Sequence, residues 1–215
     1  MMKILESAPG RYDAGLRILT LGRLDKAYDR LASLISKGQK ALDIGCGTGA
    51  LAIRAALQGA FVKGIDINSG MLEIARTRIQ SLRLESNISL REMGVAELDN
   101  EESESYDVVT SGLCFSELSE DELYYTLMQV ERILKPGGRL LIADESRPED
   151  KRKWIISRLL RIPLAAVTFL ITQTTSKAVV NLPQKIEKAG LIIHSVRRSF
   201  LQDFIEVTAG KPKKR

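Results

Sequence analysis

The chain has 215 residues, a length that suits a single α/β domain spanning 1–215 with a full hydrophobic core. Its formal net charge is +5, and part of that excess lies in the basic runs 151–153 and 210–215. Aromatic residues make up only 5% and are not interleaved with the basic ones, so no nucleic-acid partner is expected. The two cysteines are far apart and no apolar signal segment begins the sequence, which together favour a cytoplasmic protein.

The segment 8–38 precedes the first predicted strand. Within it, 12–22 is typical of a short helix and a turn, and 25–35 places its apolar side chains on one helical face. Two interpretations stay open for this segment. It is either a helix packed on the sheet or an N-terminal helical lid over the ligand mouth, which would carry Tyr12.

An apolar run that ends at Asp43-Ile44 leads into three alternating glycines, Gly45, Gly47 and Gly49, and then into the predicted helix 50–57. A strand, a glycine turn and a helix bring the backbone close to a ligand at a helix N-terminus. The next strand, 60–65, ends at Asp66, whose carboxylate can accept hydrogen bonds from both hydroxyls of a ribose. This pair predicts a nucleoside-binding half-site, and both NAD(P) and S-adenosylmethionine fit it.

Strands and helices then alternate regularly. A helix from Asn68 or Ser69 to Leu82 and one from the capping box 119–122 to Leu134 are expected. Further strands are predicted at 87–93, 106–111 and 139–144, and a last helix at 183–189 precedes the paired strands 191–199 and 203–208. This order predicts an α/β fold with a Rossmann-like, doubly wound, mostly parallel seven-stranded sheet and a C-terminal antiparallel hairpin.

Four motifs, taken together and in this order, resemble the class I S-adenosylmethionine-dependent methyltransferases: 43–49, 64–68, 106–109 and 134–138. The resemblance covers nearly the whole chain. A dehydrogenase that binds NAD(P) has no reason to carry the Lys-Pro-Gly-Gly turn of 135–138, so the resemblance favours S-adenosylmethionine. The chain looks most like the ubiquinone/menaquinone-biosynthesis C-methyltransferase type, through Tyr12-Asp13 and Leu21-Gly22. Residues 6–25 are also similar to small methyltransferases associated with corrinoid proteins.

The resemblance implies a set of cofactor-binding positions. The glycines would lie against the methionine part of the cofactor with Asp43 beneath them, and Asp66 would hold the ribose. Two apolar side chains would pack on the adenine and a short loop would reach its edge, although Val95 stands where many relatives have an acid. The end of the fourth strand would line the path to the acceptor. The implied residues are Asp43, Gly45, Cys46, Gly47, Gly49, Asp66, Ile67, Met71, Ala96, Glu97, Ser111 and Leu113.

The sulfonium of S-adenosylmethionine is already an activated methyl donor, so such an enzyme mainly aligns its acceptor. Tyr12 and Glu117 are the candidates for a proton acceptor. His194 is the single histidine, which argues against a metal site. Cys114 follows the fourth strand, where a small cysteine more often packs than reacts.

The segment 151–180 is predicted to be a helical insertion that caps the acceptor pocket. Its first part is basic and amphipathic with Trp154, and 162–176 carries no charge. Pro163 and Arg161 interrupt the apolar stretch, so it should not cross a bilayer. It could instead contact a membrane surface through 151–172 or form a homodimer interface.

These features lead to one expected function. The chain should transfer a methyl group to a small-molecule or lipid-like acceptor that is hydrophobic or bulky, at carbon. A methyltransferase that serves a corrinoid protein, or a non-catalytic protein that binds S-adenosylmethionine, is the alternative.

Overall fold

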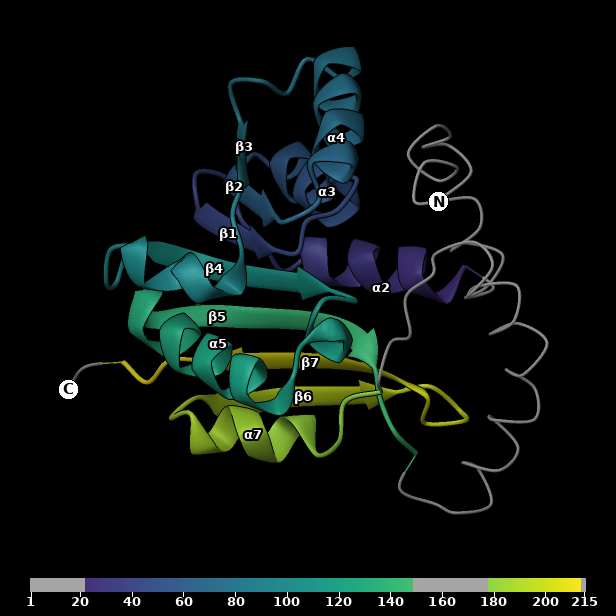
Figure 1. Ribbon diagram of the computed structural model, residues 1–215, viewed down its shortest axis with the longest axis vertical. Helices are drawn as coiled ribbons and strands as arrows, with labels where there is room; N and C mark the ends of the chain where they lie inside the picture. The colour runs from purple at the N-terminus through teal and green to yellow at the C-terminus, as the bar shows by residue number, and fades with distance from the viewer. Residues whose placement is uncertain (1–21, 149–177, 214–215) are drawn as a thin grey trace.

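The structure, a computed structural model, describes residues 22–148 and 178–213. In this part of the chain seven strands form one sheet in the order β3-β2-β1-β4-β5-β7-β6 (Figure 1). The strands β1 to β5 are parallel, and β7 runs antiparallel to both β5 and β6. The predicted fold class and its C-terminal hairpin are therefore confirmed. The strands are β1 (Lys40–Ile44), β2 (Phe61–Asp66), β3 (Ile88–Glu92), β4 (Tyr106–Gly112), β5 (Leu134–Glu145), β6 (Ile192–Arg198) and β7 (Phe204–Gly210).

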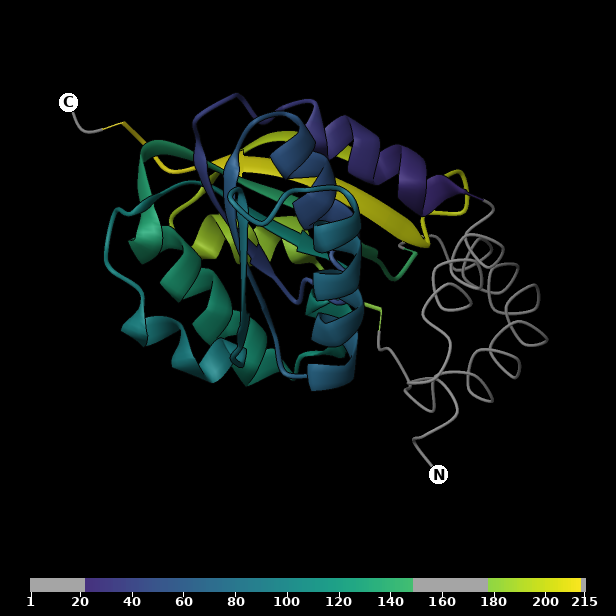
Figure 2. The same ribbon diagram turned by 90° about the horizontal axis from the view of Figure 1, so that it is seen from above.

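Helices cover both faces of the sheet (Figure 2), which agrees with the nearly continuous burial of the central strands β1 and β4. One face packs against α2 (Arg23–Ala32), α3 (Ala50–Leu57) and α4 (Ser69–Ser81). The other packs against the short helix η2 (Val95–Asn100), α5 (Glu120–Ile133) and α7 (Leu182–Lys188). Neighbouring residues of β4 show the division, since Val108 belongs to the first core and Val109 to the second. None of the helices in the described ranges is long and apolar enough to cross a membrane.

Two helix starts follow from the capping residues that the sequence supplies. The Asn68 side chain accepts a hydrogen bond from the Met71 amide at 3.1 Å and opens α4. At the start of α5, Ser119 and Glu122 exchange the two hydrogen bonds of a capping box. Both predicted starts are confirmed.

The Lys-Pro-Gly-Gly stretch does not lie where it was expected. We predicted that 135–138 would form a turn ahead of a strand beginning at Arg139, but β5 already begins at Leu134, which pairs with Tyr106. The register then shifts, and Arg139 pairs with Val108. Gly137 has φ of 80°, a backbone conformation open to glycine, so the stretch forms an irregularity inside the strand.

Helix α2 is the only described helix of the predicted lid segment 8–38. Leu24, Tyr28 and Leu31 are buried, and they pack on the same face of the sheet as α3. Residues 8–21 of that segment, and 151–177 of the predicted cap 151–180, lie outside the described residues. The lid and the cap stay predictions.

The strand order reverses between β1 and β4. From β1 the chain winds outward through β2 and β3, and from β4 it winds the other way through β5. In open parallel sheets a ligand binds in the crevice outside the carboxyl ends of the strands at such a switch point. A ligand site is therefore expected at the carboxyl ends of β1, β2, β4 and β5.

Candidate functional site

The glycine loop follows β1 at the switch point. Gly45, Gly47 and Gly49 have φ of 67°, 51° and 78°, in the left-handed region that side chains with a Cβ rarely adopt. The Cys46 amide donates to the Ile65 carbonyl at 2.9 Å, which ties the loop to β2. A Cβ built on Gly47 would meet nothing within 4 Å, so the backbone there borders open space. A ligand can therefore approach this loop closely.

Asp66, at the end of β2, is oriented by the glycine loop. Its Oδ2 accepts the Gly47 amide at 2.8 Å and its Oδ1 accepts the Asn68 amide at 2.8 Å. An ionised carboxylate offers about four acceptor positions, so two remain for further donors. The half-buried Asp66 can thus hold two hydroxyl groups without releasing the loop.

Asp43 lies beneath the loop and is fully enclosed. Its Oδ1 accepts the Thr110 hydroxyl at 2.6 Å, and it is 1% exposed. Burial raises the pKa of the Asp43 carboxyl to about 7, although hydrogen bonds from Thr110 and the Ala52 amide oppose that rise. Asp43 therefore fastens the loop to β4 and to the start of α3.

The predicted adenine side is formed by two segments that meet beyond β2. Ile67 is 76% exposed, and a Cβ on Gly94 would come within 3.2 Å of its Cγ2. An isoleucine this exposed beside a carboxylate leaves apolar surface that a flat ring could cover. Met71, four residues after Ile67, is half-buried in the first turn of α4.

The loop at Ala96 and Glu97 is stabilised from within. The Glu97 carboxylate accepts the Gly94 amide at 3.0 Å, and the Ala96 carbonyl accepts the Tyr125 hydroxyl at 3.3 Å. Both residues are exposed. The side chain of Glu97 thus holds the start of η2 rather than pointing free into the crevice.

The end of β4 carries a strained backbone. Leu113 has φ of 59°, an unusual conformation for a bulky residue, and its amide donates to the Ala143 carbonyl at 2.9 Å. Ser111 is fully buried, and among the described residues its hydroxyl has no hydrogen-bond partner. Of these two predicted positions, only Leu113 presents a partly exposed side chain.

Cys114 packs directly against the glycine loop. A Cβ on Gly45 would lie 2.5 Å from both Cβ and Sγ of Cys114. Desolvation, followed by the nearby charges of Asp144 and Glu117, raises the pKa of the Cys114 thiol. Burial likewise raises the pKa of Cys46, so both thiols stay protonated and pack rather than react.

The short helix η3 (Phe115–Glu117) follows Cys114 and carries a candidate proton acceptor. The Glu117 side chain is exposed, yet partial desolvation by neighbouring atoms and the charges of Asp66 and Glu145 raise its pKa. Glu117 therefore shares its electrostatic surroundings with the ribose-binding candidate. Tyr12, the other candidate, lies outside the described residues.

Two residues near the carboxyl ends of β4 and β5 were not predicted as site residues from the sequence. Asp144, fully buried at the end of β5, accepts the Phe115 amide at 2.8 Å and the Ser116 amide at 3.3 Å. Its position as an acid at the carboxyl end of a parallel strand is a signal that could have identified it. Tyr28 of α2 places its hydroxyl against Gly112, a contact between distant segments that no local pattern reveals.

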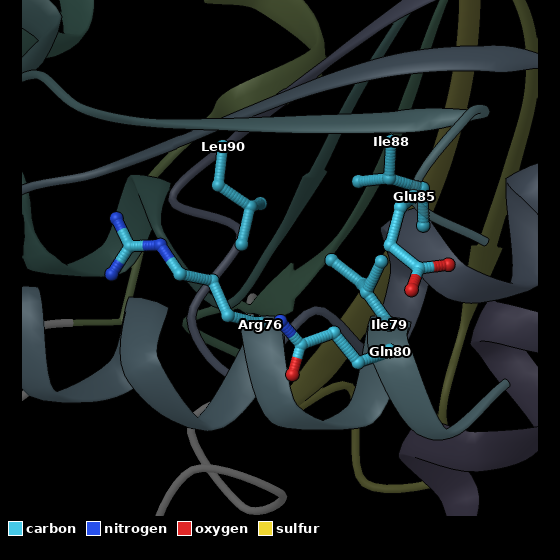
Figure 3. Close-up of a pocket in the computed structure, with 6 residues that line it drawn as sticks. All are labelled: Arg76, Ile79, Gln80, Glu85, Ile88 and Leu90. Carbon is cyan, nitrogen blue, oxygen red and sulfur yellow. The ribbon is translucent and has the colours of Figure 1, made fainter. Parts of the chain in front are cut away.

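A separate groove lies between α4 and β3 (Figure 3). Its apolar floor is Ile79, Ile88 and Leu90, and its rim is polar with Arg76, Gln80 and Glu85. None of its lining residues belongs to the glycine loop or is one of the predicted cofactor-binding positions. No group of three His, Cys, Asp or Glu side chains within residues 22–148 and 178–213 could hold a metal ion.

Comparison with known proteins places this site in a family. A family model described as a methyltransferase domain matches residues 35–189. The ubiquinone/menaquinone biosynthesis C-methyltransferase UbiE of Psychromonas ingrahamii is 31% identical over 150 residues, covering 67% of this chain and 59% of that protein. The methyltransferase GfsG of Streptomyces halstedii is 32% identical over 173 residues, covering 78% of this chain and 57% of that protein. The chain thus spans less than two thirds of the length of these relatives.

Solved structures share the fold at low identity. The [4+2]-cyclase SpnF superposes with a TM-score of 0.71 at 17% identity, covering 88% of this chain and 81% of that one. A geranyl diphosphate methyltransferase in complex with S-adenosylmethionine superposes with a TM-score of 0.64 at 14% identity, covering 88% of this chain and 84% of that one. With the family model spanning the glycine loop, Asp66 and η3, the chain belongs to the methyltransferase domain family.

Proposed function

We propose that this protein is an S-adenosylmethionine-dependent methyltransferase. The observation that carries the proposal is the hydrogen bond between the Gly47 amide and Asp66 Oδ2 at 2.8 Å. It joins a glycine loop with open space above it to a carboxylate that has acceptor positions left for a ribose. Membership of the methyltransferase domain family supports the same cofactor.

Each part of the cofactor has a matching surface. Asp66 would accept the two ribose hydroxyls, and the exposed Ile67 would lie against the adenine. The amino-acid part would then extend across β1 toward Leu113 and the loop that begins at Gly45. Carboxylates around the crevice suit a ligand that carries both an ammonium and a sulfonium charge, because opposite charges attract most strongly where water is excluded.

The cofactor, once bound, supplies a methyl group on a positively charged sulfur that a nucleophile can attack in line. The acceptor atom forms the new bond to carbon while the sulfur takes the electron pair of the breaking bond, and the acceptor loses a proton. We propose Glu117 as the group that takes that proton. Its raised pKa makes it a stronger base than an ordinary carboxylate.

The acceptor is proposed to be a hydrophobic or bulky small molecule that is methylated at carbon. Support comes from the relatives, since the UbiE of Psychromonas ingrahamii is a C-methyltransferase of quinone biosynthesis by name. A membrane-surface contact through 151–172, a homodimer and a corrinoid partner stay predictions. The first of these falls outside the described residues.

A transfer screen tests the proposal. The protein is incubated with S-adenosylmethionine labelled in its methyl group and with quinols, lipids or cell extract, and the label is followed into organic-soluble products. Transfer that is lost in Asp66→Ala and reduced in Glu117→Gln is the expected result. Tight binding of the cofactor with no transfer to any acceptor would instead favour a non-catalytic binding protein, and transfer unchanged in Glu117→Gln would remove its role.

A further inference from the structure

The loop 113–117 between β4 and α5 is held in place by one buried carboxylate. Asp144 Oδ2 accepts the amides of Phe115 at 2.8 Å and Ser116 at 3.3 Å, while its Oδ1 accepts the Glu145 amide at 2.7 Å. Asp144 is 0% exposed, so water cannot replace these bonds. Each of these three bonds goes to a backbone amide, and two of the three go to η3.

Loop 113–117 also contacts the glycine loop. A Cβ on Gly45 would come within 2.5 Å of Cys114 Cβ, so the two loops are in direct contact. Leu113 at φ 59° shows that the chain is bent sharply to reach this position. A strained backbone persists only when the surrounding structure fixes it, and Asp144 provides bonds on the far side of the bend.

We propose that Asp144 is a positioning residue, which holds loop 113–117 against the glycine loop and so forms the pocket for the amino-acid end of the cofactor. This inference rests on the proposed function. The location supports it, because a ligand with its ribose on Asp66 of β2 must cross β1 to bring its amino-acid end to β4. Asp144 does not itself touch the ligand. It determines in what fraction of the protein molecules loop 113–117 is in place and the pocket is formed.

Binding of three probes tests the role by titration calorimetry. In Asp144→Asn one amide oxygen must replace two carboxylate oxygens, so the loop should be formed in fewer molecules. The apparent Kd rises in inverse proportion to that fraction, about tenfold if a tenth of the molecules remain competent. S-adenosylmethionine and S-adenosylhomocysteine should weaken equally, while 5′-methylthioadenosine, which lacks the amino-acid end, should change less than about twofold.

A control variant and a second variant at Asp144 show whether the change in binding is specific to this carboxylate. Asp107→Asn is the matched control, because Asp107 also accepts a backbone amide of another segment, that of Lys40 at 2.8 Å, but at the amino-terminal ends of β1 and β4. It should leave all three Kd values unchanged. Asp144→Ala, which keeps no acceptor, should exceed the effect of Asp144→Asn; if it does not fold, the asparagine variant alone decides.

The outcomes separate the two proposals. If the unaltered protein fails to bind S-adenosylmethionine, the proposed function is wrong. If it binds, and Asp144→Asn binds each of the three probes as tightly as the unaltered protein does, the positioning role is wrong. Loss confined to S-adenosylmethionine would mean that Asp144 acts through its charge on the sulfonium, and an equal loss for 5′-methylthioadenosine would mean a general structural defect. Either result overturns the positioning role.

Discussion

Replacing Gly45 by alanine should destabilise the protein more than the same change at a glycine with free space. At Gly45 the added Cβ would lie 2.5 Å from both Cβ and Sγ of Cys114, closer than atoms of a folded protein approach. Relieving such a clash costs about 1–3 kcal/mol, and holding alanine at φ 67° costs roughly 1–2 kcal/mol more. The free energy of unfolding should therefore fall by about 2–5 kcal/mol.

The chain offers a matched control and a rescue for this experiment. Gly38 has φ of 81°, but an added Cβ there would meet nothing within 4 Å, so Gly38→Ala should cost only the backbone part, roughly 1–2 kcal/mol. Cys114→Gly removes both clashing atoms, and in that background Gly45→Ala should lose about 1–3 kcal/mol of its effect. Urea denaturation measures all four variants. Equal costs at Gly45 and Gly38, or no coupling to Cys114, would refute the contact between the two loops.

Three further predictions follow from separate features. Glu101 is buried and accepts from Lys63 Nζ and the Tyr106 hydroxyl, each at 2.5 Å, so Glu101→Gln should lower the free energy of unfolding by about 2 kcal/mol in urea denaturation. Burial raises the pKa of Asp43 to about 7, above its unfolded value, so its ionisation opposes folding. The free energy of unfolding should therefore fall as the pH rises from about 4 to about 7, and Asp43→Asn should flatten that slope. Ile67→Ser should weaken S-adenosylmethionine binding by about tenfold with no change in Tm, because this side chain is 76% exposed; unchanged binding would remove Ile67 from the adenine site.

The elements that local chemistry determines were predicted from the sequence. The glycine loop, the Asn68 cap and the capping box at Ser119 depend on residues within a few positions of one another, and the structure has them where they were expected. The alternation of strands and helices also predicted the doubly wound sheet. Its order then brought the predicted residues of β1, β2 and β4 to the same end of neighbouring strands.

What the sequence did not predict depends on contacts between distant segments. Asp144 was recognised only as the end of a strand, because its partners Phe115 and Ser116 lie 29 and 28 residues away. The early start of β5 was missed for a similar reason: Pro136 and two glycines are typical of a turn, and only the pairing of Leu134 with Tyr106 keeps the stretch in the sheet. Local propensity gave way to tertiary pairing there.

The most direct test of the account is the choice of cofactor by the unaltered protein in titration calorimetry. We predict that S-adenosylmethionine binds with a Kd in the micromolar range, at roughly −8 kcal/mol, and that NADH gives no signal. Asp66→Ala should weaken this binding by at least about tenfold, while His194→Ala, an exposed position on β6, should leave it unchanged. Binding of NADH without S-adenosylmethionine, or equal effects of the two variants, would contradict the assignment of the crevice.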